Sequence, residues 1–98
     1  MQSDARFTDA LLHNRIEKGY GPSWIARELQ DKGVSDDLIE TALYSGEVDW
    51  YACAARVHEK KFGGSKPDSF RERARQSRFL QYRGFTGEHI RGVFNRED

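Results

Sequence analysis

Apolar residues recur every three or four positions through the first half of the chain, which is typical of helices that bury one face. The first stripe comprises Phe7, Leu11, Leu12, Ile16 and Tyr20. Pro22 suits the first turn of a second helix, because its missing N–H needs no partner there. Gly33 suits the left-handed position just past the end of that helix. Ser35 is placed to cap a third helix, which Ser45-Gly46 ends.

The pattern then restarts. Asp49 is a predicted cap for a fourth helix, whose stripe comprises Tyr51, Ala54, Ala55, His58 and Phe62. A capping-box spacing in "SFRE" predicts that a fifth helix begins at Ser69, and Gly84 ends it. Thr86 is placed to cap a sixth helix that carries Ile90, Val93 and Phe94. No stretch alternates apolar and polar residues well enough to predict a strand.

The two halves of the chain resemble each other. "EKGYG" at 17–21 matches "EKKFG" at 59–63, and "ELQDKGVSDDLI" at 28–39 matches "FLQYRGFTGEHI" at 79–90. The second half carries nine extra residues, in and around the loop "GGSKP" at 63–67. Repeats of this length indicate stacked helical units. We therefore predict an all-α fold of two tandem three-helix repeats, residues 1–47 and 48–98, in an elongated molecule.

A structural explanation accounts for the motif that both repeats share, "KGVS" and "RGFT". Glycine ends the second helix, the apolar residue packs back on the core, and the hydroxyl caps the third helix. The motif therefore requires no ligand. By the same reasoning, the glycines at 19–21 are predicted to form a corner between two helices.

Charge is distributed unevenly although the net charge is zero. Residues 1–49 carry a net charge of −5 and residues 50–98 a net charge of +5. Such asymmetry suggests two electrostatic faces or a polar partner. Cys53 is the only cysteine, so no internal disulfide can form. The chain has no apolar run of membrane-spanning length and no signal-peptide pattern, so a cytoplasmic protein without a membrane partner is expected.

Sites for small molecules are not expected. "GYGPSW" lacks the spacing and the Lys-Ser/Thr pair of a phosphate loop. The three histidines lie in different predicted helices, with His13 and His89 expected at the surface and His58 at the edge of an apolar stripe. Cys53 lies among alanines, as a small core residue does. We therefore predict no catalytic residue, no metal site, no cofactor and no small-molecule substrate.

The strongest local signal is an arginine-rich helix, "SFRERARQSRFLQYRG". The residues predicted to bind a partner or DNA are Arg71, Arg73, Arg75, Arg78 and Arg83, with Lys60, Lys61 and Lys66 extending the patch. Three of the arginines are three and four residues apart and so share one helical face. Arginine forks bind phosphates and carboxylates alike. The alternative is a solvated helix that only aids solubility. Tyr82 and Phe85 could stack on bases, but both are expected in the core.

The combined pattern resembles the RecX family of regulators of the bacterial recombinase RecA. The stretches that carry the resemblance are "GYGPSWIARELQDKG", "VSDDLIETAL" and "RARQSRFLQYRGFTGEHIRGVF". The resemblance implies tandem three-helix repeats in an elongated, curved molecule. It also implies binding to the RecA–DNA filament and inhibition of its recombinase, ATPase and coprotease activities, without cofactors or catalytic residues. Family members usually have three repeats, so we expect an N-terminal one to be absent here.

Two other functions stay open from the residues alone. One is a stand-alone DNA-binding protein of the helix-turn-helix kind, whose recognition helix would be "TGEHIRGVF" or the acidic "SDDLIETAL". The other is a helical scaffold without any role at nucleic acid, which the zero net charge permits. If the chain also contacts single-stranded DNA, we expect it to do so through the basic C-terminal half.

Overall fold

The computed structural model describes residues 4–63 and 66–95, and all regular structure in these residues is α-helical. The six helices are α1 (Asp4–Glu17), α2 (Pro22–Asp31), α3 (Asp36–Tyr44), α4 (Trp50–Phe62), α5 (Phe70–Tyr82) and α6 (Gly87–Asn95). The prediction of an all-α fold is therefore confirmed. Residues 64–65 of the expected loop "GGSKP" lie outside the described residues.

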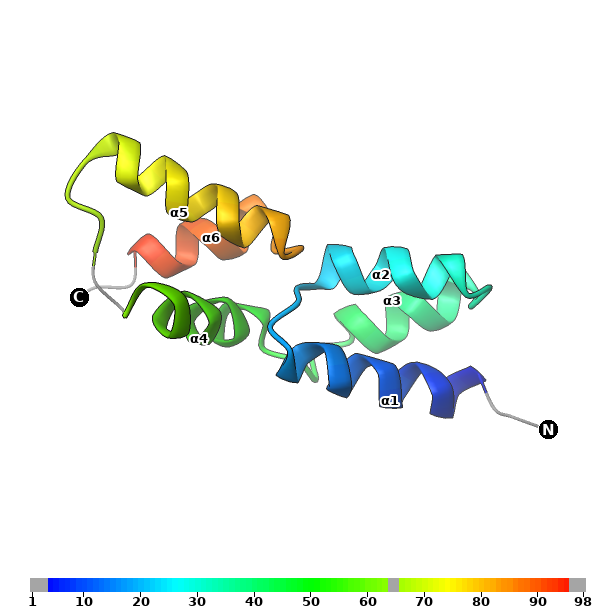
Figure 1. Ribbon diagram of the computed structural model, residues 1–98. Helices are drawn as coiled ribbons and strands as arrows, with labels where there is room; N and C mark the ends of the chain where they lie inside the picture. Colours follow the sequence, from blue (N-terminus) through cyan, green and yellow to red (C-terminus); the bar gives the residue numbers. More distant parts are fainter. Residues whose placement is uncertain (1–3, 64–65, 96–98) are drawn as a thin grey trace.

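The helices form two three-helix units that follow each other along the long axis of the molecule (Figure 1). In the first unit α3 packs against α1 and α2, and in the second unit α6 packs against α4 and α5. The principal-axis extents are 52 × 23 × 19 Å, so the prediction of an elongated molecule is confirmed. Each unit buries one apolar face of every helix, as stacked repeats do.

The same turn ends the second helix of both units. Val34 donates its backbone N–H to the carbonyl of Leu29, and Phe85 donates to that of Leu80, each at 3.1 Å. The glycine of each turn has a left-handed backbone, and Val34 and Phe85 are buried. The structural explanation of the shared "KGVS" and "RGFT" motif is therefore confirmed.

Side-chain caps begin the helices where they were predicted. Ser35, Asp49 and Ser69 each accept a hydrogen bond from the backbone N–H three residues later, at 3.3, 3.1 and 3.1 Å. Thr86 accepts one from the N–H of His89 at 3.4 Å and returns one from its own N–H to the imidazole. These caps satisfy donors that the first helical turn leaves unpaired.

The start of α4 differs from the predicted stripe at two side chains. Trp50 is buried and donates its indole N–H to the carbonyl of Leu43 at 2.7 Å, which ties α4 to the end of α3. Tyr51, expected in the stripe, is 44% exposed. Its ring lies over Gly92, where a Cβ would come within 2.6 Å, and its hydroxyl donates to Glu88. The real stripe is therefore shifted by one residue at the start of α4.

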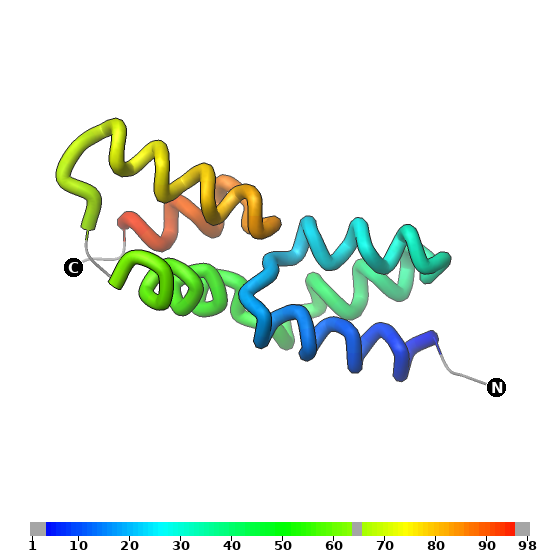
Figure 2. Tube along the Cα trace, viewed as in Figure 1, coloured from blue at the N-terminus to red at the C-terminus, as the bar shows by residue number. Residues whose placement is uncertain are grey.

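The two units meet where the end of α5 abuts the start of α2 (Figure 2). Gly21 donates its N–H to the carbonyl of Arg83 at 2.7 Å, and Ser23 donates to that of Gly84 at 2.9 Å. A Cβ on Gly21 would lie 2.6 Å from the Gly84 backbone, and a Cβ on Gly84 would lie 2.5 Å from the Cβ of Trp24. The two glycines therefore let the backbones touch. The predicted corner at 19–21 is also the contact between the units.

The junction predicts different costs for the same substitution in the two repeats. Gly33 and Gly84 both have positive φ, 84° and 103°, but a Cβ at Gly33 meets nothing within 4 Å. Gly33→Ala should cost about 1–2 kcal/mol of unfolding free energy, from backbone strain alone. Gly84→Ala carries the same strain and a clash with Trp24, and should cost at least about 2 kcal/mol more. Urea unfolding of both variants measures the difference, and equal losses would contradict the close approach.

Candidate partner-binding surface

The eight basic residues predicted as a partner-binding patch are placed in four settings. Arg71 and Arg78 lie on the exposed outer side of α5, and Arg73 and Arg75 lie against aromatic rings. Lys60, Lys61 and Arg83 line a hollow between the two units. Lys66 lies in the connection before α5 and lines shallow hollows beside Arg73 and Arg75. The residues therefore surround α5 rather than forming one flat patch.

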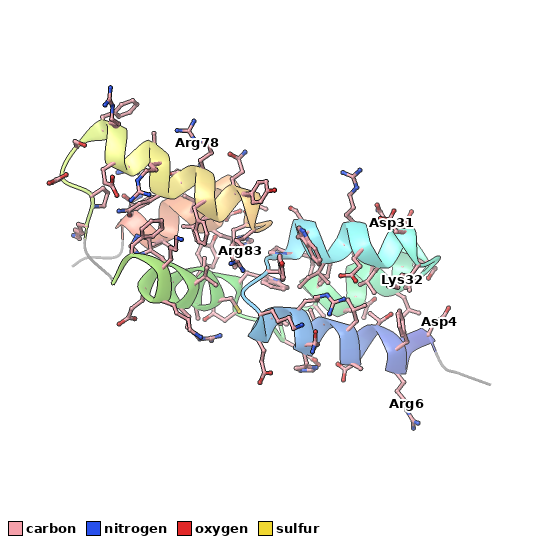
Figure 3. The ribbon with its side chains drawn as sticks, in the orientation of Figure 1. Asp4, Arg6, Asp31, Lys32, Arg78 and Arg83 are labelled. Carbon is pink, nitrogen blue, oxygen red and sulfur yellow. The ribbon has the colours of Figure 1, made fainter. Side chains whose placement is uncertain are left out.

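The outer side of α5 carries the most accessible basic groups. Arg71 and Arg78 are exposed, and neither takes part in any ion pair of the described residues. Figure 3 shows Arg78 pointing away from the bundle. Tyr82 lies one turn beyond Arg78 and is 86% exposed, so the expectation that it lies in the core is wrong. Helical periodicity places positions 71, 75, 78 and 82 on one side of α5, and all four residues are exposed. Phe85, at 2% exposure, is in the core as expected.

Arg73 and Arg75 are held by the second unit itself. The Arg73 guanidinium lies 4.8 Å from the ring centre of Phe94, and that of Arg75 lies 5.3 Å from the ring centre of Phe62. Arg75 also binds the Glu72 carboxylate with two donors, at 3.1 and 2.8 Å. That hydrogen-bonded carboxylate raises the pKa of Arg75. Arg75 is therefore less available to a partner than Arg71 or Arg78.

A polar network links Glu72 to α4. Gln76 is buried; its amide N–H donates to Glu72 at 2.9 Å, and its amide oxygen lies 2.7 Å from the imidazole of His58. Hydrogen bonds from Arg75 and then from Gln76 lower the pKa of Glu72 to about 2. His58 was expected at the edge of the apolar stripe, but it is only 5% exposed. The hydrogen bond to Gln76 on α5 offsets the cost of burying the imidazole, because buried polar groups need a partner.

Arg83 connects the two units. Its guanidinium lies 5.2 Å from the ring centres of Tyr20 and of Phe79, and it donates to the carbonyl of Lys18 at 2.9 Å. Figure 3 shows Arg83 at the gap between the units. Lys18 and Arg56 line the same hollow, and the sequence did not single out either residue. Arg56 is four residues before Lys60 on α4, a spacing that could have indicated it, whereas only the packing of the units brings Lys18 there.

Groups with other chemistry are placed as structural residues. Burial raises the pKa of the Cys53 thiol, which suits a core residue rather than a nucleophile. His13 is exposed as expected, but His89 is 9% exposed, so the expectation of a surface position is wrong. Burial lowers the pKa of His89, whose imidazole is used in the Thr86 cap. The part of the chain that the structure describes has no cluster of three metal-ligating side chains, and none of its helices could cross a membrane.

The helix-turn-helix interpretation fits these helices poorly. A recognition helix needs an exposed face of polar groups that reach base edges without repelling phosphates. The exposed residues of α3 include Asp36, Asp37 and Glu40. On α6 the exposed Glu88 would repel phosphates near Arg91, and His89 is buried and so cannot reach base edges. Neither third helix therefore offers a surface suited to the major groove.

Comparison with known families matches each unit separately. Residues 3–43 match the description "RecX, second three-helix domain", and residues 47–94 match "RecX, third three-helix domain". A Regulatory protein RecX from Halorhodospira halophila is 44% identical over 90 residues, 92% of this chain and 56% of that protein. Those from Cronobacter sakazakii and Legionella pneumophila are each 43% identical, over 93% and 95% of this chain and 55% and 62% of their own lengths.

The chain thus spans little more than half the length of these curated relatives. The similarity nevertheless extends through both units and includes the α1–α2 corner and the end of α5, which form the junction. The relatives are named as regulatory proteins, which agrees with the expectation that the chain is not an enzyme.

The Glu72 network predicts how stability depends on pH. The pKa of Glu72 is lowered from its usual 4.5 to about 2, so its contribution to stability is present above pH 4.5 and is lost as the pH falls toward 2. Chemical unfolding at pH 6 and at pH 2.5 should show a smaller acid-induced loss for Glu72→Gln than for the original chain. Glu59→Gln is the control, because Glu59 is an exposed carboxylate outside the ion pairs of the described residues. Parallel losses in all three proteins would contradict the network.

Proposed function

The chain belongs to the RecX family, and on that premise we propose that it binds the RecA–DNA filament and inhibits its recombinase, ATPase and coprotease activities. The proposal places the chain in the control of DNA repair and of the SOS response. The main support for this proposal is that the two three-helix units match successive RecX domains.

The outer side of α5 is the surface that we propose docks on the filament. Arg71 and Arg78 present guanidinium groups that are not engaged in ion pairs of the described residues, so docking would break no internal salt bridge. Guanidinium groups bind phosphate and carboxylate oxygens with paired hydrogen bonds. The surface therefore suits a filament in which acidic protein groups and DNA phosphates lie near each other.

Contact with single-stranded DNA would involve Tyr82. Its ring is 86% exposed, and Arg78 lies one helical turn before it on the same side of α5. Exposed aromatic rings beside basic side chains bind unpaired bases by stacking, at about 1–3 kcal/mol per base. Residues 1–49 carry a net charge of −5, so the first unit would face protein or solvent rather than phosphates.

The function is tested by ATP hydrolysis of RecA on single-stranded DNA. Adding this chain should lower the hydrolysis rate, and a hybrid in which it replaces the matching segment of the Legionella pneumophila relative should lower it further. The hybrid matters because the relative is longer than this chain. An ATP hydrolysis rate that neither protein changes would contradict the filament proposal.

The docking surface is tested by charge reversal. Arg71→Glu combined with Arg78→Glu should weaken co-sedimentation with RecA filaments by about tenfold, because two attractive charges become repulsive. Arg27→Glu combined with Lys32→Glu makes the same change in charge on exposed positions of the first unit. We expect that control to bind within about twofold of the original chain. Similar binding by both double variants would show that α5 is not the docking surface.

A further inference from the structure

A hollow of about 230 Å³ lies between the α1–α2 corner, α4 and the end of α5. Both units contribute to it, so it exists only because they stack end to end. Its lining comprises Ile16, Glu17, Lys18, Gly19, Arg56, Val57, Lys60, Lys61, Phe79 and Arg83. Figure 3 labels Arg83, which marks the place of the hollow at the gap between the units.

The lining of the hollow carries an excess of positive charge. Five cationic side chains line it, and Glu17 is the one carboxylate among the lining residues. Across residues 4–63 and 66–95, none of these cations takes part in an ion pair. Like charges held close together repel, and an anion placed among them relieves that repulsion. The lining therefore selects a negatively charged ligand.

The apolar residues that line the hollow limit which kind of anion can bind there. Ile16 and Val57 provide aliphatic surface beside the cations. The ring of Phe79 is not free for a base, because Lys61 and Arg83 lie 5.3 and 5.2 Å from its centre and Phe62 packs edge-on against it. A nucleobase would thus find no open aromatic face in the hollow, whereas a small aliphatic side chain would find matching walls.

The volume of the hollow also favours a small aliphatic side chain over a nucleotide. Pockets for drug-sized ligands measure about 300–1,000 Å³, so this hollow suits one side chain rather than a whole nucleotide. Lys18, Arg56 and Lys60 are exposed and can reach carboxylates on either side of such a side chain.

We propose that the inter-unit hollow binds an acidic peptide segment in which one aliphatic side chain is flanked by carboxylates. The aliphatic group contacts Ile16 and Val57, and the flanking carboxylates pair with Lys18 of the first unit and Lys60 of the second. The ligand class follows from the lining of the hollow and does not depend on RecA. The site is also separate from Arg71 and Arg78, which lie on the outer side of α5.

The test uses a fluorescein-labelled probe peptide of sequence Asp-Glu-Leu-Glu-Asp and fluorescence anisotropy. Lys18→Glu and Lys60→Glu should each weaken binding by about tenfold, although the two residues are far apart in the sequence. Arg27→Glu, an exposed position outside the hollow, is the matched control and should leave the affinity unchanged. A probe with Ala in place of Leu should bind about fivefold more weakly, because it loses the aliphatic contact. Circular dichroism checks that each variant is folded.

Four outcomes would overturn the proposal. The first is no measurable binding of the probe, and the second is equal weakening by Arg27→Glu. The third is binding of a thymidine oligonucleotide that Lys60→Glu abolishes while the peptide does not compete. The fourth is self-association of the chain that Lys18→Glu or Lys60→Glu removes, which would make a second copy the ligand. Because RecA is absent from this experiment, its failure and the failure of the filament proposal can be told apart.

Discussion

The end-to-end arrangement of the two units is set by a direct backbone contact between the end of α5 and the start of α2, with side-chain hydrogen bonds from Trp50 and Arg83 beside it. A helix leaves carbonyls unpaired at its last turn and N–H groups unpaired at its first turn. Here Gly21 and Ser23 donate to Arg83 and Gly84, so each helix end satisfies the other. The partial charges of the two helix ends are also opposite, which favours the same contact. Such a contact requires the two backbones to approach closely. Gly21 and Gly84 allow this because they have no Cβ.

That contact explains why Arg83 differs from the other arginines of α5. Its position at the junction places it between Tyr20 and Phe79, and its donor reaches the carbonyl of Lys18. An arginine used in this way is part of the architecture as well as part of a charged surface. Arg73 and Arg75 are also held by rings of their own unit, which leaves Arg71 and Arg78 as the outward charges of the helix.

Local signals in the sequence predicted local structure well. Ser35, Asp49 and Ser69 cap helices where their spacing indicated, because a cap involves only a few neighbouring residues. The family was also identified from the repeated motifs. Side-chain environments that depend on distant packing were predicted less well. Tyr82 was expected in the core and is exposed, and His89 was expected at the surface and is buried, since a neighbouring element decides the burial of each. Lys18 joins a charged hollow only through the stacking of the units, which no local pattern encodes.

The opposite net charges of the two halves acquire a physical meaning once the units lie end to end. Residues 1–49 carry −5 and residues 50–98 carry +5, and the two units are separated along the longest dimension of the molecule. The protein is therefore a permanent electric dipole directed along its long axis. In the field of a polyanion such a molecule experiences a torque before any contact forms, and its basic unit arrives first. Raising the salt concentration would shorten the range of this alignment.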